Sequence, residues 1–230
     1  MNIVAIDPSL ISTAVCINDM MFNYCRYTDA HGKNGALSKW YDKLEKIVNF
    51  KYVEYDSFDN YSDGEIIKLR NYNKITDGIV SDILNNIDLN DETKIVTEGY
   101  SFASNPTSII DLVTFSTLLR NKIFERVTED ILVLSPSTLK LESCKLTYEP
   151  VNIGKKTEKL VYQNNDGIKG GSFTKREMVI SMMDNDKIQT PFAIHCRSIR
   201  DELLATTKIS KPYDDICDSQ MLSEIVKTKY

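Results

Sequence analysis

Three aspartates crowd the segment KPYDDICDSQML near the end of the chain: Asp214, Asp215 and Asp218. On a helix, residues three or four positions apart share one face, so at least two of these carboxylates lie together. Like charges on one face oppose helix formation. The helix dipole nevertheless stabilises an acidic residue in a first turn by about 0.3 to 1 kcal/mol. Taken alone, the run is explained equally well by a solvated first turn and by a functional acidic site.

Two further acids follow predicted strands. Asp7 ends the run NIVAID and precedes Pro8, and Glu98 ends KIVTE and precedes Gly99. A single acid at a strand end is usually a turn residue. Two such ends and an acidic helix start can converge at the carboxyl edge of one sheet, where open α/β folds place their sites. We therefore expect Asp7 and Glu98 to lie near the acidic helix.

Carboxylates gathered in this way raise one another's pKa and oppose folding unless cations neutralise them. Hard oxygen ligands suit Mg²⁺ or Mn²⁺, which keep several waters and bind phosphate oxygens. Two such ions about 4 Å apart can activate water on one side of a phosphodiester and stabilise the leaving oxygen on the other. The acidic residues thus predict a metal site for phosphoryl chemistry.

The elements that must position these acids alternate between strand and helix, which indicates a layered α/β fold. Residues 2–26 predict three adjacent strands at hairpin spacing. Apolar spacing predicts helices over 36–49 and 63–87, a strand over 94–100, a helix over 107–127 and a strand ending in a proline turn over 131–140. A helix over 173–183 and a last helix from near Pro212 follow. Residues 144–172 interrupt this alternation and predict a projecting hairpin or loop.

Composition narrows the class of protein. With 230 residues and 42% hydrophobic content, the chain can bury the core of a single domain. The net charge of −5 argues against a generic cationic coat protein. Five cysteines without CxxC spacing indicate reduced thiols rather than a disulfide framework or zinc site. With no basic leader and no stretch near 20 apolar residues, a soluble protein of the cytoplasm, or at most the nucleus, is expected.

Other catalytic classes find little support. His31 lies in a glycine-containing loop and His195 beside Cys196, and neither has a nucleophile motif around it. No glycine-rich phosphate loop is present in the sequence, which argues against ATP hydrolysis.

Three motifs, in order, resemble those of the RuvC-type Holliday junction resolvases, particularly their phage and poxvirus branch, within the RNase H-like superfamily. They are IVAIDPSLISTAVCI, IVTEGYSFASN and KPYDDICDSQML. The likeness covers residues 1–28, 93–143 and 170–226. It implies an RNase H-like fold, in which a mixed five-stranded sheet carries helices on both faces.

The resemblance also implies the site residues. Asp7, Glu98, Asp215 and Asp218 would be catalytic and would bind two Mg²⁺ ions, with Mn²⁺ as a substitute. Asp214 is the main rival to Asp215, and the family spacing of three to the final aspartate favours Asp215. Basic residues expected near the cleaved phosphate match Lys140 and Lys175, each of which would otherwise be a solvated surface charge. Phe102 matches an aromatic position that stacks on or wedges at unpaired bases, or else packs in the protein.

Two segments depart from the compact family pattern, near 30–60 and 144–169. The second carries four lysines that we predict to contact DNA: Lys155, Lys156, Lys159 and Lys169. The apolar residues of SIIDLVTFSTLL occupy more than one helical face, which suits burial within one chain or pairing across a two-fold axis.

The expected function is a Mg²⁺-dependent endonuclease that resolves four-way or branched DNA by paired nicks as a homodimer. Hydrolysis would leave a 5′-phosphate and a 3′-hydroxyl. A cytoplasmic location, bacterial or in the host of a virus, is expected. Two alternatives stay open: an RNase H-like nuclease for flaps or RNA-containing substrates, and a non-catalytic nucleic-acid-binding module.

Overall fold

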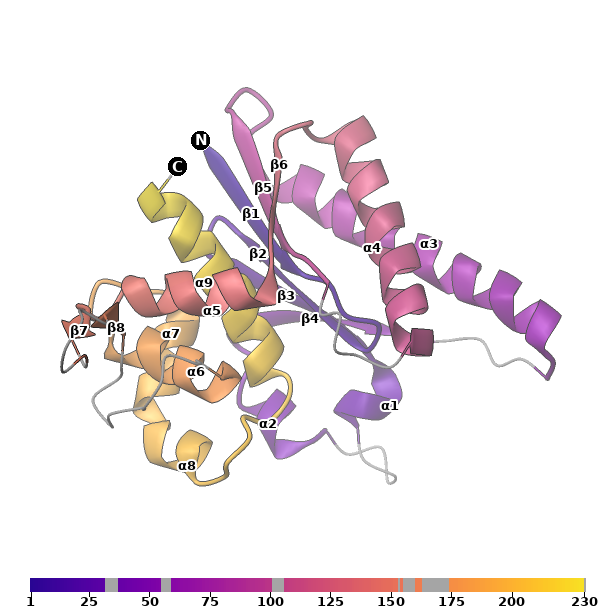
Figure 1. The fold of residues 1–230 in the computed structure, drawn as a ribbon. Coiled ribbons are helices and arrows are strands. Elements are labelled where there is room, and N and C mark those ends of the chain that lie inside the picture. Colours follow the sequence, from indigo (N-terminus) through magenta and orange to yellow (C-terminus); the bar gives the residue numbers. More distant parts are fainter. Residues whose placement is uncertain are drawn as a thin grey trace.

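The computed structural model describes residues 1–31, 37–54, 59–100, 106–152, 154, 160–162 and 174–229. Its centre is a six-stranded sheet in the order β4-β3-β2-β1-β5-β6 (Figure 1). The strands are β1 (Asn2–Asp7), β2 (Ser12–Ile17), β3 (Met20–Arg26), β4 (Val48–Val53), β5 (Thr93–Glu98) and β6 (Ile131–Leu134). Only β2 is antiparallel to its neighbours, so the other five strands end at one edge.

Helices cover both faces of this sheet (Figure 1). Helices α3 (Tyr61–Asn86) and α4 (Pro106–Arg126) pack on one face. Helix α9 (Tyr213–Lys229) crosses the other and is flanked by α5 (Pro136–Lys145), α6 (Lys175–Asp184), α7 (Pro191–Ser198) and α8 (Arg200–Leu204). The mixed α/β prediction is confirmed, with six strands in place of the expected five.

The strand β1 shows why the sheet must be covered twice. All six of its residues are buried. Ile3 and Ala5 pack in the core beneath α9, whereas Val4 and Ile6 pack against α3 and α4. Since successive side chains point to opposite faces, Asp7 continues the α9 face. The alternation therefore directs this carboxylate toward the acidic helix.

The helix predicted over 36–49 was wrong, and the extra strand begins within its last two residues. Among the described residues 37–49, only α2 (Lys39–Asp42) is helical, and the short α1 (Tyr27–Ala30) precedes it. Val48–Val53 instead forms β4 and pairs in parallel with β3. The segment VNFKYV is rich in β-branched and aromatic residues, which suit a half-buried strand. Tertiary pairing therefore overrode the helical spacing of the apolar residues.

The remaining element predictions fare better. The helices expected over 63–87, 107–127, 173–183 and after Pro212 correspond to α3, α4, α6 and α9. Strand β6 ends at Leu134, but Pro136 then begins α5, whose cap Ser135 accepts a hydrogen bond from the Thr138 amide. A hairpin of β7 (Val151–Asn152) and β8 (Leu160–Val161) matches the projecting segment. Within the described residues, no helix is both long and apolar enough to span a membrane.

Candidate active site

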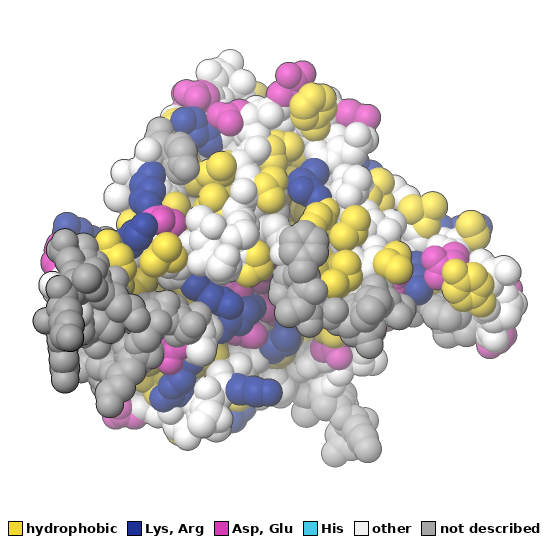
Figure 2. Space-filling view, in the orientation of Figure 1, with side chains coloured by type: hydrophobic (Ala, Val, Ile, Leu, Met, Phe, Trp, Pro, Cys, Tyr) yellow, Lys and Arg dark blue, Asp and Glu magenta, His cyan; other side chains and the backbone are white. Residues whose placement is uncertain are grey.

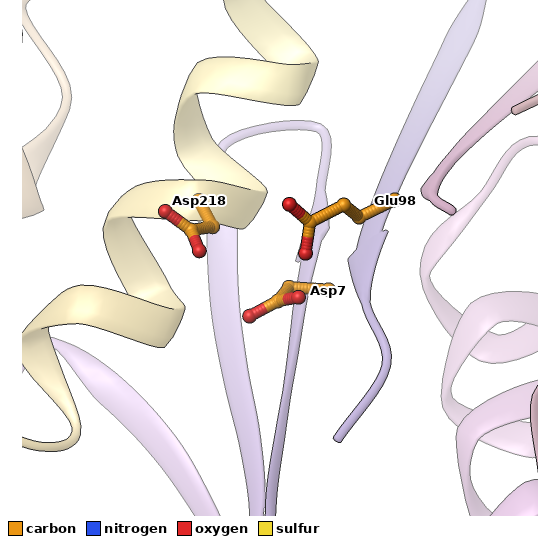
Figure 3. Close-up of side chains that lie close together, drawn as sticks. All are labelled: Asp7, Glu98 and Asp218. Atoms are coloured by element: carbon orange, nitrogen blue, oxygen red, sulfur yellow. The ribbon is translucent and has the colours of Figure 1, made fainter. Parts of the chain in front are cut away.

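Asp7, Glu98 and Asp218 converge at the carboxyl edge of the sheet (Figure 3). Strands β1 and β5 are parallel neighbours with Ile6 opposite Thr97, so both end at the same level. Helix α9 crosses this edge and presents Asp218 to both strand ends. One oxygen from each carboxylate lies within 4.8 Å of the others. Three segments far apart in sequence therefore build one acidic cluster.

The cluster is largely withdrawn from water. Asp7 is 4% exposed and Asp218 only 1%. Burial raises the pKa of Asp7, and the charge of Glu98 raises it further. Burial likewise raises the pKa of Asp218, with Asp7 adding to the effect, and burial is also the main reason that the pKa of Glu98 is raised. These carboxyl groups resist ionisation until a cation joins them.

Lys175, the first residue of α6, supplies one such cation. Its Nζ atom lies 2.5 Å from Asp218 Oδ2 and 3.8 Å from Asp215 Oδ1. Burial lowers the pKa of Lys175, but the carboxylates of Asp7 and Asp218 outweigh that effect and raise it overall. The lysine expected from the sequence is therefore a charged member of the cluster.

A second lysine was missed by sequence reasoning. Lys211 Nζ donates to both carboxylate oxygens of Asp215, at 3.1 and 2.8 Å. The two residues are four positions apart, a spacing that favours ion pairs within a helix. Lys211, however, precedes α9, so helical spacing gave no reason to pair it with Asp215. Only the turn before the helix brings them together.

These groups border an open cleft of about 400 Å³. Figure 2 shows basic side chains gathered around acidic ones in the middle of this face. Asp7, Glu98, Asp215, Lys140, Lys175 and Lys211 all line the cleft. Asp214 instead lines a neighbouring pocket with Thr174, Lys175 and Arg176. Of the two adjacent aspartates, Asp215 faces the cleft that holds the cluster.

The donor set fits a hard divalent cation. Asp218 Oδ1 is buried and accepts no hydrogen bond from any residue that the structure describes. The cluster offers only carboxylate oxygens, the ligands that Mg²⁺ and Mn²⁺ prefer. When all are ionised, the four carboxylates of Asp7, Glu98, Asp215 and Asp218 exceed the two ammonium groups of Lys175 and Lys211 by two negative charges. One divalent cation would balance that excess, and a bound phosphodiester would offset part of the charge of a second.

The structure describes only one further residue that was predicted to contact DNA, Lys140. Phe102, Lys155, Lys156, Lys159 and Lys169 lie outside the described residues. Lys140 is partly buried on α5 and lines the cleft, so it is on a helix rather than on the strand and turn expected for it.

Comparison with known proteins gives a likeness in shape. No family model matches the sequence, and no curated protein matches it significantly. A Thermus thermophilus RuvC structure is similar to 99% of this chain over 96% of its own, with 9% identity and a TM-score of 0.47. T. thermophilus RuvC in complex with a Holliday junction substrate is similar over 98% and 91%, with 8% identity and a TM-score of 0.46. Likeness of this extent does not identify the function, and the chemistry proposed below rests on the side chains of this chain.

Proposed function

We propose that this protein is a divalent-metal-dependent endonuclease that cuts branched DNA, with four-way junctions as its main substrate. One observation carries the proposal: the buried carboxylates of Asp7 and Asp218 and the partly buried carboxylate of Glu98 have oxygens within 4.8 Å of one another, beside a cleft lined by lysines. Acidic clusters are common on protein surfaces. A cluster that is buried and ringed by cations is suited to a phosphodiester, because its carboxylates bind metal and its lysines bind phosphate.

Asp7, Glu98, Asp215 and Asp218 would hold two Mg²⁺ ions, with Mn²⁺ as a substitute. Bound there, the ions would supply an activated water and stabilise the oxygen that leaves. The water oxygen would lose a proton and attack phosphorus, the bond to the 3′ oxygen would break, and that oxygen would take up a proton, which would leave a 5′-phosphate and a 3′-hydroxyl. The chain's own contribution is a rigid and largely buried site, since β1 and β5 each fix one carboxylate and α9 fixes two.

The lysines have separate roles in this proposal. Lys175 lies deepest, against Asp218, and would stabilise negative charge that develops on the phosphate during cleavage. Lys211 holds Asp215 through both oxygens and would orient it. Lys140 lines the wall of the cleft and would bind a neighbouring phosphate. Contacts of this kind give affinity without reading base sequence.

The preference for branched DNA, the placement in a phage- and poxvirus-like branch and the location in a bacterial or viral-host cytoplasm rest on the sequence motifs. So does the homodimer, in which two sites would cut strands of opposite arms.

A cleavage assay tests the proposal. Purified protein is incubated with a four-way junction, a flap, an RNA–DNA hybrid and a linear duplex of equal length, in Mg²⁺ and in EDTA. We expect symmetric nicks in the junction with Mg²⁺ only. Preferred cleavage of the flap or the hybrid would mean that flaps or RNA-containing molecules, rather than four-way junctions, are the main substrate. Binding without cleavage of any substrate would make the protein a non-catalytic DNA-binding module.

A further inference from the structure

A group of aromatic rings lies at the same sheet edge as the acidic cluster but three strands away from β1. Tyr27 stacks on His31, with ring centroids 3.9 Å apart and planes 12° apart. Tyr52 meets His31 edge to face at 5.0 Å. Tyr27 and Tyr52 are 43% and 40% exposed. We call Tyr27, His31 and Tyr52 the aromatic platform.

Two further aromatic side chains, Phe50 and Tyr41, support the aromatic platform. Phe50 stacks on Tyr52 with centroids 6.1 Å apart and planes 11° apart. The buried Tyr41 packs against Phe50 at 5.3 Å. The ring of Tyr52 is thus held by Phe50 and His31 while 40% of the residue stays exposed to solvent. A braced, exposed ring can accept another flat ring at little cost in conformational entropy.

Sheet register relates the platform to the acidic cluster. Asp7 lies opposite Ala14, Ala14 opposite Asn23, and Asn23 opposite Phe50. Cross-strand partners lie on the same face, so Phe50 shares the face of Asp7. Tyr52, two residues further on, shares it too. Three strand spacings and two residues of rise separate Tyr52 from Asp7 by about 16 Å.

That separation corresponds to a few nucleotides of a DNA strand. Between the two features, Asn23 of β3 donates a hydrogen bond from Nδ2 to the hydroxyl group of Ser12 of β2 at 3.0 Å. This places the platform on ordered structure continuous with the end of β1. Branch points in DNA leave bases unpaired, and every base has a π-face that can stack on an aromatic ring.

We propose that the aromatic platform stacks an unpaired base of the DNA whose backbone lies in the acidic cleft. This inference rests on the proposed nuclease function for its substrate. Strand β4, which was not predicted from the sequence, brings Tyr52 to the sheet edge that carries the acidic cluster. Tyr27, His31 and Tyr52 are therefore part of the substrate-binding surface, which favours DNA with unpaired bases over intact duplex.

The test uses 2-aminopurine, a fluorescent base that is quenched when it stacks. It is placed at the branch of a four-way junction and, separately, in single-stranded DNA, both in EDTA so that no cleavage occurs. We expect wild-type protein to quench both probes. Tyr52→Leu and Tyr27→Leu keep apolar bulk without a π-face and should each weaken binding about 5- to 150-fold, the loss typical of one stacked base. Tyr52→Phe should bind as wild type does.

Tyr61→Leu is the matched control, because Tyr61 is 81% exposed at the start of α3, outside the platform. It should leave quenching unchanged, and thermal unfolding should show that all variants are folded. If Tyr27→Leu and Tyr52→Leu bind and quench as wild type does, the platform is overturned and the nuclease proposal stands. If wild type quenches the probes through the platform but cuts no substrate in Mg²⁺, the platform stands and the nuclease proposal fails. Absence of any DNA binding by wild type would overturn both.

Discussion

Asp7 and Glu98 are the last residues of β1 and β5, and Asp218 lies in the second turn of α9, so each carboxylate is attached to regular structure. Conversion to the amide keeps each shape but removes a charge that would bind metal. We expect Asp7→Asn, Glu98→Gln and Asp218→Asn each to lower Mg²⁺-dependent cleavage by more than about 100-fold, since loss of outer partners alone costs 10- to 100-fold. Junction binding should persist, because every DNA-contacting cation is retained. Single-turnover cleavage and a gel-shift assay measure the two effects, and near-normal cleavage by Asp7→Asn would refute the metal assignment.

Asp214 and Asp215 allow a sharper comparison between adjacent residues. Asp215 lines the acidic cleft and binds Lys211, whereas Asp214 lines the neighbouring pocket. Asp215→Asn should therefore reduce cleavage far more than Asp214→Asn in the same single-turnover assay. The reverse order would show that the final motif had been aligned one residue off.

Sequence reasoning succeeds at this scale where a residue's place follows from its own element. Asp7 and Glu98 end strands that read clearly as buried, and parallel pairing brings such ends together. Lys211 could not be found this way, because its contact with Asp215 depends on the turn before α9. The ion pairs of Lys175 with the cluster similarly depend on how α6 packs beside α9, which no local pattern reveals.

At the scale of elements, the segment over 36–53 shows how a periodic pattern can mislead. Trp40, Tyr41, Leu44, Ile47 and Val48 follow helical spacing, yet only one short helix forms. Val48 belongs to β4, where pairing with Met21 of β3 gives it partners that an isolated helix lacks. The spacing of apolar residues within a segment does not show whether the sheet has an edge strand with which that segment can pair. The long, strongly periodic helices α3 and α4 were predictable because packing and pattern agree.

The lysine-bearing segment over 144–169 leads to a prediction about affinity. An acidic protein must attract DNA through a local basic patch, and Lys155, Lys156 and Lys159 are candidates for it. Removal of each lysine–phosphate interaction should reduce the slope of log affinity against log salt by roughly 0.9 on duplex arms. The triple alanine variant should thus bind junctions more weakly and with a flatter salt dependence, while cleavage of the saturated complex is unchanged. Binding isotherms at several salt concentrations measure the slope, and an unaltered slope would remove this segment from the DNA-binding face.

Assembly belongs to the scale of the whole molecule. Strand β6 ends the sheet at one side, and beside it α4 leaves apolar side chains exposed: Ile110 is 67% and Phe124 52% exposed, and Val133 of β6 is 45% exposed. We expect the protein to sediment at twice its chain mass of 26.3 kDa.

Phe124→Glu should shift the protein to the monomer, because the new carboxylate would be buried in the interface without a partner. Ile194→Glu, at a 50% exposed site on α7 and so on the opposite face of the sheet from α4, is the control. A wild-type monomer, both free and on a junction, would exclude paired cutting by a homodimer.

The acidic cluster also sets how stability responds to metal and to pH. The pKa values of Asp7, Glu98 and Asp218 are raised in the folded protein, mainly by burial. Between the ordinary carboxyl pKa and these raised values, the folded state binds more protons than the unfolded state, so stability without metal falls as pH rises through that window.

Asp218→Asn removes one of these groups and should raise the melting temperature in EDTA at neutral pH. The rise should be roughly 2 to 4 °C for each kcal/mol that the change adds to the free energy of unfolding of a chain of this size. Mg²⁺ should stabilise wild type increasingly as pH rises, because deprotonation creates its ligands, and should stabilise Asp218→Asn much less. Melting curves at several pH values, with Mg²⁺ and with EDTA, measure both effects. A wild-type melting temperature that is indifferent to Mg²⁺ at every pH, up to millimolar concentrations, would show that the cluster does not bind the ion.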